Sequence, residues 1–308
     1  MGRARRLVPA IILCGAAAGV AAQEPPEPTS DLEVGVRYWV GSGSTRRSHD
    51  ASGISPLLLN PTSTLVYSNL DANTLELYGR KSFGERWFAK GNLGAGRINT
   101  GTFTDQDFFI DMGVPVMTQT VSAVSGKLQY ASADVGRDVL QLGEATVSLF
   151  AGYQVWSERL DAHGLSDSFG SFGIDPNTLV ISNDLTWKSW RLGAEMRAVR
   201  GRMRFSVEAA LVPYAKYRNE DSHYLRQSPG DLGPVPNVIA TGHGWGGQFE
   251  AEVRRSYPEL WGLEFGIGAR YWKLDSEKGS QSQAGLSFPI VNLESKRYGF
   301  TLSATKSW

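Results

Sequence analysis

The chain has 308 residues, enough for one large domain or two ordinary ones. Lys and Arg together number 31, as do Asp and Glu, and this balance excludes the strongly basic surface expected of a nucleic-acid-binding protein. A hydrophobic content of 41% and a mean hydropathy of −0.24 exclude a bundle of transmembrane helices, because each such helix needs about 20 consecutive apolar residues. The 35 Gly, 11 Tyr and 9 Trp favour a chain rich in strands and turns.

The N-terminal segment resembles a secretory signal peptide. Three arginines in the first six residues precede an apolar run at 7–20, and two alanines follow it. We therefore expect a signal peptide at 1–22, an extended Pro-rich leader at 23–30 and one folded domain at 31–308. The single cysteine, Cys14, lies in the signal peptide, so the mature chain forms no disulfide in an oxidising compartment.

From Asp31 onward, apolar residues recur at every second position, which is the period of a strand with two unlike faces. The pattern is clear along 32–40, 203–211 and 263–271. The alternate face carries charges and glycines, which is typical of a barrel with lipid outside and a polar interior. The sequence therefore predicts an all-β protein, a transmembrane β-barrel. A soluble all-β protein is the alternative.

The spacing predicts ten strands, at 31–43, 64–82, 86–100, 120–139, 143–160, 176–197, 202–219, 238–256, 262–276 and 289–308. Tight connections near Gly84, Leu142, Gly201 and Pro258 alternate with long ones. The long connections lie at 44–63, 101–119, 161–175, 220–237 and 277–288. This alternation and the even strand count indicate an antiparallel, up-and-down outer-membrane barrel with periplasmic turns and extracellular loops.

Two of the long loops carry residues suited to general acid–base chemistry. The second contains Asp105 and Asp107, and the fourth contains Asp221 and His223. If the chain starts in the periplasm, both loops reach the same extracellular rim. A carboxylate beside a histidine is a general-base arrangement, and an acidic pair opposite it is suited to holding a water.

Strict alternation conflicts with this arrangement. Outward parity carried along the third and seventh strands places all four side chains on the lipid-facing side. Each strand therefore needs a bulge that resets its register before the rim, and Pro213, Gly94 and Gly96 are the candidate positions.

Several motifs resemble segments of the omptins, the outer-membrane barrel proteases of bacteria. The two principal motifs are Asp105-Gln106-Asp107-Phe108 and Asn219-Glu220-Asp221-Ser222-His223-Tyr224. Two further segments occur in the same order and at similar spacing, Ser68-Asn69-Leu70-Asp71 and Ala151-Gly152-Tyr153-Gln154. The resemblance covers nearly all of the mature chain.

The resemblance implies a surface endopeptidase that acts on peptides or proteins through an activated water, with no metal and no acyl-enzyme. Asp221 and His223 would form the dyad, with His223 as general base. Asp105 and Asp107 would position and polarise the water and help to stabilise the tetrahedral intermediate. The enzyme would sit in the bacterial outer membrane with its active site facing the cell exterior.

The chain departs from the family at positions that matter for specificity. Omptins prefer basic residues around the scissile bond, held by acids at the mouth of the barrel. Asn219 replaces one of these acids here, and Arg47 aligns loosely with another. Preference for dibasic sites, the natural substrate and the oligomeric state are therefore left open.

Omptins also depend on lipopolysaccharide, bound by basic side chains on the outer wall. Tyr153 matches that region, and Arg159, Lys188 and Arg191 are candidate phosphate partners. An ordinary basic girdle is the alternative interpretation of the three basic residues.

Other residues favour structural roles. We expect His243 to be structural rather than part of the cleft, and His49 and His163 lack the spacing of a metal site. Parity places Trp39, Trp156 and Trp272 inside the lumen.

Two further functions remain open. One is a non-enzymatic barrel acting as adhesin or structural protein. The other is a small pore, which inward Arg and Glu side chains paired across the lumen would oppose.

Overall fold

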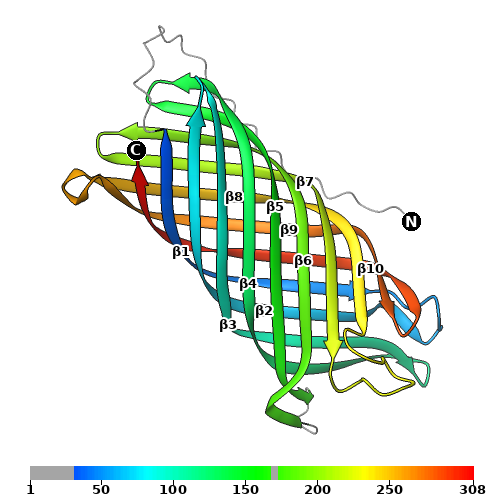
Figure 1. Ribbon diagram of the computed structural model, residues 1–308. Helices are drawn as coiled ribbons and strands as arrows, with labels where there is room; N and C mark the ends of the chain where they lie inside the picture. The colour runs from blue at the N-terminus through cyan, green and yellow to red at the C-terminus, as the bar shows by residue number, and fades with distance from the viewer. Residues whose placement is uncertain (1–30, 168–172) are drawn as a thin grey trace.

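A computed structural model describes residues 31–167 and 173–308 as a closed antiparallel barrel of ten strands (Figure 1). Each strand pairs with its neighbours in the chain, and β1 pairs with β10 to close the ring. The predicted fold class is therefore confirmed. The predicted signal peptide (1–22) and leader (23–30) lie outside the described residues.

The strands are longer than the sequence suggested. They are β1 (Leu32–His49), β2 (Leu58–Phe83), β3 (Trp87–Asp111), β4 (Val114–Leu142), β5 (Ala145–Asp167), β6 (Gly173–Arg200), β7 (Met203–His223), β8 (Val238–Tyr257), β9 (Leu263–Gln283) and β10 (Leu286–Ser307). A single 3₁₀ turn, η1 (Pro258–Leu260), precedes β9. The described part of the chain contains no helix with the length and hydropathy needed to span a bilayer.

Two predicted long loops were wrong, and so was most of a third, because residues 161–167 and 173–175 of the predicted loop 161–175 belong to β5 and β6. The segments 101–119 and 277–288 are the extended ends of β3–β4 and β9–β10, joined at Met112-Gly113 and Ala284-Gly285. Neither strand end keeps the period of two, because 277–288 is largely polar and 101–119 carries a consecutive apolar run at Phe108–Ile110. The apolar alternation that identifies a membrane strand is therefore absent, although the backbone pairing continues.

The barrel has two unlike ends, which we call the turn end and the loop end. The turn end holds Leu32, Trp308 and the tight connections at Gly84, Gly143 and Gly201 (Figure 1). Each of these three glycines has a positive φ. The loop end holds the connections that follow β1, β3, β7 and β9, together with the end of β5 and the start of β6. The longest described connection is 224–237, between β7 and β8.

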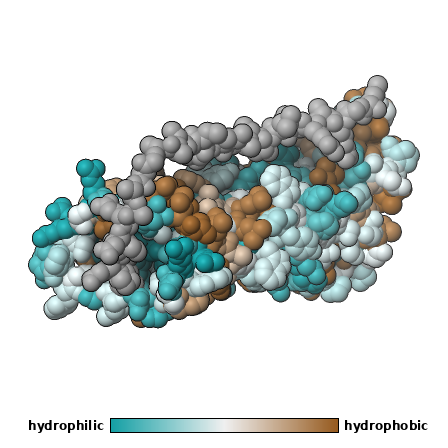
Figure 2. Space-filling view, turned by 90° about the horizontal axis from the view of Figure 1, so that it is seen from above, coloured by the Kyte–Doolittle hydropathy of each residue, from teal (hydrophilic) through white to brown (hydrophobic). Residues whose placement is uncertain are grey.

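Exposed apolar side chains form a belt around the half of the wall nearest the turn end. They include Val36, Val40, Leu93, Leu149, Leu192, Phe205, Leu211, Ile267, Phe300 and Leu302. On the face seen in Figure 2, apolar side chains gather near the middle, and further ones lie at the end on the right. Such a belt suits the hydrocarbon layer, so the loop-end half projects beyond the membrane-spanning part.

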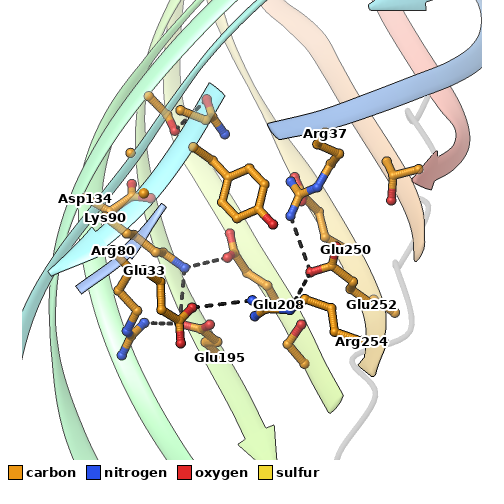
Figure 3. Close-up of a pocket in the computed structure, with 18 of the residues that line it drawn as sticks. Glu33, Arg37, Arg80, Lys90, Asp134, Glu195, Glu208, Glu250, Glu252 and Arg254 are labelled. Atoms are coloured by element: carbon orange, nitrogen blue, oxygen red, sulfur yellow. Dashed lines mark hydrogen bonds and ion pairs between the residues drawn. The ribbon is translucent and has the colours of Figure 1, made fainter. Parts of the chain in front are cut away.

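A network of ion pairs fills the lumen beside the belt (Figure 3). Arg37 contacts Glu76 at 2.8 Å, Arg80 contacts Glu195 at 2.7 Å, and Arg204 contacts Glu264 at 2.6 Å. Arg37 and Glu76 are neighbours on β1 and β2, and Arg204 and Glu264 lie two strands apart, on β7 and β9. Arg80 on β2 and Glu195 on β6 pair across the lumen. The expected pairing of inward Arg and Glu side chains is confirmed.

An aromatic layer lies between this network and the loop end. Trp39, Trp156 and Trp272 are all at most 2% exposed, as parity predicts. The ring centroids of Trp39 and Trp272 lie 5.3 Å apart, and the Arg270 guanidinium lies 4.7 Å from the Trp272 ring. Buried aromatic rings in mutual contact contribute strongly to packing, so this layer forms a firm floor beneath the loop end.

Three bulges reset the side-chain parity below the loop end. β7 gains one residue between Val212 and Ala215, which confirms Pro213 as the position of that shift. β3 gains one residue between Ile98 and Thr102, so the expectation of a shift at Gly94 or Gly96 was wrong. β2 shifts at Ser68–Asp71, where Asn69 adopts a left-handed φ of 51°.

Candidate active site

The loop-end lumen is built on one side by β1, β2 and β3 in register. Arg47 lies beside Leu65 and Leu65 beside Asp105, and in the next row His49, Ser63 and Asp107 are neighbours in the same way. Because every member of a row points to the same face, both aspartates project inward. The bulge in β3 produces this orientation, since without it they would face outward.

The opposite wall is built by β6, β7 and β8. After the bulge at Pro213, residues 215, 217, 219 and 221 are buried on the inward face. Asp221 lies between Asn183 of β6 and Val238 of β8, and His223 ends the strand. The two segments that carry the omptin-like motifs therefore face each other across the lumen.

Between the two walls lies a cleft of about 260 Å³. Asp105, Asp107 and His223 all contribute to its lining, whereas Asp221 is fully buried beside it. Further lining residues are Arg47, His49, Ile54, Leu58, Ser63, Leu65, Arg226, Leu232, Val238, Leu286 and Phe288. The cleft brings three of the four candidate catalytic residues together outside the membrane-spanning belt.

The two aspartates share an environment that favours retention of a proton. Burial, followed by the neighbouring Asp107 charge, raises the pKa of Asp105 to about 7. Burial also raises the pKa of Asp107, against the opposing effects of Ser63, Arg226 and His223. Ser63 Oγ lies 3.4 Å from Asp105 Oδ1. The pair therefore titrates as a unit and holds a proton near neutral pH.

His223 is held by Asn237, from the β7–β8 connection. The backbone N–H of His223 donates to Asn237 Oδ1 at 3.0 Å, and ring Nδ1 lies 3.3 Å from the same oxygen. Asn237 Nδ2 donates back to the His223 carbonyl at 3.2 Å. Burial lowers the pKa of His223 below its ordinary value, while the Asp221 charge raises it, so the ring is neutral at pH 7.

Asp221 is bonded differently from the expected dyad. One carboxylate oxygen accepts from Asn183 Nδ2 and the other from the Arg47 guanidinium, which crosses from β1. The same guanidinium donates to Asn219 Oδ1. Among the described contacts the ring of His223 therefore bonds to Asn237, and Asp221 acts on it through its charge.

The candidate lipopolysaccharide residues divide between the two faces of the wall. Tyr153, Arg159 and Lys188 are exposed on the outer face of β5 and β6, and the Tyr153 ring lies 5.0 Å from Trp190. The structure contradicts the placement of Arg191 in this set. It is 2% exposed and points into the lumen, where it pairs with Glu208 and Asp134, because it lies on the inward parity of β6.

The remaining histidines lie in three places. His243 is on the outer face of β8, stacked on Tyr214 with ring centroids 5.6 Å apart, so it lies outside the cleft. His163 is in β5, with Nδ1 3.2 Å from the Asp161 carbonyl. In residues 31–167 and 173–308 no group of three or more His, Cys, Asp or Glu side chains is placed to hold a metal ion.

Sequence reasoning placed Arg47 loosely at the barrel mouth, but it missed the contacts of this residue and several other residues of the site. Arg47 and His49 become visible once the alternation of β1 is continued past residue 43. Ser63 follows only from the β2–β3 register. Asn237 lies in a Pro-rich connection with no periodicity, and no signal in the sequence identified it.

Comparison with known proteins supports the fold. No protein-family model matches the chain, and no curated protein matches its sequence. Among solved structures, the outer membrane protease OmpT from Escherichia coli is similar, with a TM-score of 0.69 and 13% identity over 91% of this chain and 98% of that chain. The translocator domain of the autotransporter NalP from Neisseria meningitidis has a TM-score of 0.40 and 11% identity, over 92% and 90% of the two chains. The chain therefore has the fold of a bacterial outer-membrane barrel and resembles OmpT, an omptin, along nearly its whole length.

Proposed function

We propose that this chain is an outer-membrane endopeptidase of omptin type, which hydrolyses peptide bonds with a water activated in the loop-end cleft. The observation that carries the proposal is the convergence of Asp105, Asp107 and His223 on one cleft from strands far apart in the sequence. The similarity of the fold to OmpT agrees with it.

His223 is the general base in this proposal. With Nδ1 donating to the oxygen of Asn237, Nε2 carries the lone pair and accepts the proton of the attacking water. The lowered pKa keeps the ring neutral in the resting state. As the charge on the ring develops, the buried carboxylate of Asp221 stabilises it, and the proton then passes to the leaving amine.

Asp105 and Asp107 act on the other side of the water and the scissile carbonyl. One ionised carboxylate orients the water. The proton that the pair retains near neutrality is donated as a hydrogen bond to the carbonyl oxygen, whose negative charge grows in the tetrahedral intermediate. The aspartate pair therefore supplies both an acceptor and a donor.

The barrel fold also supports a location for the protein in the outer membrane. We propose that the loop end faces the cell exterior, where peptides and proteins reach the cleft. Tyr153, Arg159 and Lys188 would contact lipopolysaccharide from the outer wall, with the basic side chains facing its phosphates and the aromatic ring at the interface. Activity would then depend on that lipid.

The test is cleavage of a varied pool of quenched peptides by protein refolded with lipopolysaccharide. We expect the wild type to cleave some peptides, and His223→Ala and Asp107→Ala each to lose about 10² to 10⁴ in rate. His243→Ala is the matched control, because this histidine stacks on Tyr214 outside the cleft. Heat-modifiable gel migration reports folding of each variant.

Two outcomes would contradict the proposal. Either the folded wild type is inert across the pool, or the two cleft variants cleave as fast as the wild type. The first outcome would favour a non-enzymatic barrel whose loops bind a partner.

A further inference from the structure

Arg47 is an unusual occupant of the cleft. Its guanidinium enters from β1, is 5% exposed, and bonds to Asp221 and Asn219 on the opposite wall. Asn183 donates to the other oxygen of Asp221. A carboxylate with amide groups beside it is a recognition site for a guanidinium, and here the chain supplies the guanidinium itself.

This contact determines the charge that the β7 wall presents to the cleft. The positive charge of Arg47 is matched by Asp221, so this wall offers an incoming side chain neither a free carboxylate nor open space. Arg226 also lines the cleft, as a cation paired with Asp231 at 2.7 Å. Asp105 and Asp107 are the remaining lining carboxylates in the described chain, and both serve the proposed chemistry.

The rest of the cleft wall is largely apolar. Leu58, Leu65, Leu232, Val238 and Phe288 line it, and all but Leu58 are less than 10% exposed. Burying an apolar substrate side chain against such a wall stabilises binding, because it removes apolar surface from water. A basic side chain placed there would lose its hydration without gaining an anion.

We propose that Arg47 fills the guanidinium site of the cleft from within the chain, so that the cleft selects peptides with an uncharged apolar residue beside the scissile bond and rejects basic ones. This inference rests on the proposed function for the identity of the occupant. The presence of a guanidinium site under Arg47 can be tested without catalysis.

The first measurement compares cleavage of matched peptides with Leu, Phe, Lys or Arg at the variable position. We expect the wild type to favour Leu or Phe over Arg by roughly tenfold or more in kcat/KM. Arg47→Ala should raise the relative rate at Arg by at least about tenfold, because it opens the site. Arg46→Ala is the matched control, since Arg46 is the adjacent residue and lies exposed on the outer face.

The second measurement is binding of methylguanidine, followed by the shift in unfolding temperature. Arg47→Ala should be stabilised by this probe, whereas the wild type, Arg46→Ala and Arg47→Met should not, because methionine keeps the space filled without restoring the charge. Gel migration again checks that each variant folds.

The outcomes separate the two proposals. A wild type that cleaves at Arg as well as at Leu overturns this inference and needs no variant to do so. Unchanged specificity in Arg47→Ala, or no response of that variant to methylguanidine, also overturns it. A wild type inert on every peptide overturns the proposed function, while the methylguanidine shift still decides whether the site exists.

Discussion

Asn in place of Asp105 should stabilise the folded protein while removing its activity. The carboxyl of Asp105 has an ordinary pKa of 3.8, which burial and Asp107 raise to about 7 in the folded chain. A folded-state pKa above the unfolded value means that stability is fully present below about pH 4 and is lost as the pH rises through 7. Above that range the ionised carboxylate opposes folding.

The size of the effect follows from the shift. About three pKa units correspond to about 4 kcal/mol when the whole shift is carried by a buried charge. The cleft is open to solvent at the loop end, so screening reduces this value, and we expect a gain of about 2–4 kcal/mol for Asp105→Asn at pH 8. At pH 4 the gain should vanish, because the aspartate is then protonated in the folded state.

The assay is urea unfolding in lipid vesicles, followed by tryptophan fluorescence at pH 4, 6 and 8, together with peptide cleavage. Asp111→Asn is the matched control, because Asp111 is exposed at the tip of β3. Equal stability of wild type and Asp105→Asn at all three pH values would refute the assignment of a raised pKa to Asp105. Retained cleavage in the folded variant would refute its catalytic role.

Two further substitutions test the histidine and the charged lumen. Asn237→Asp puts a carboxylate against the ring of His223 and should raise the pKa of that ring. The acid limb of the kcat/KM profile should therefore move to higher pH by about one unit or more. Asn177→Asp, at an exposed position, is the control and should leave the acid limb in place. Glu76→Gln removes the charge that Arg37 and Arg270 share at 2.8 Å each and should destabilise the barrel by about 3–5 kcal/mol in the same urea assay. An unchanged urea midpoint would show that the remaining lumenal acids compensate.

The barrel itself was largely visible in the sequence, because lipid imposes a strict rule on the outer face. Val36, Val40 and Leu302 face the hydrocarbon layer and therefore alternate with inward residues. That constraint ends where the wall leaves the membrane. Beyond it, the β9–β10 strands are largely polar and the β3–β4 strands carry apolar residues without the period of two, so only backbone hydrogen-bond pairing reveals them as strands.

The candidate site was less visible, for two physical reasons. A bulge of one residue reverses every side chain that follows it, and in β3 the shift lies at Ile98–Thr102, with no Pro to mark it. The contacts of Asp221 with Arg47 and of His223 with Asn237 join segments that only closure of the barrel or the path of a Pro-rich loop brings together. The resemblance to omptins pointed to Asp105, Asp107, Asp221 and His223, but not to the partners that hold them.

The aromatic floor under the cleft has a consequence for traffic through the molecule. Trp39, Trp156 and Trp272, with the ion pairs behind them, fill the lumen beneath the cleft with packed side chains. In the proposed protease, a peptide would then enter and leave by the loop end, and its fragments would be released on that side. Such a protein would act on molecules outside the cell without importing the products.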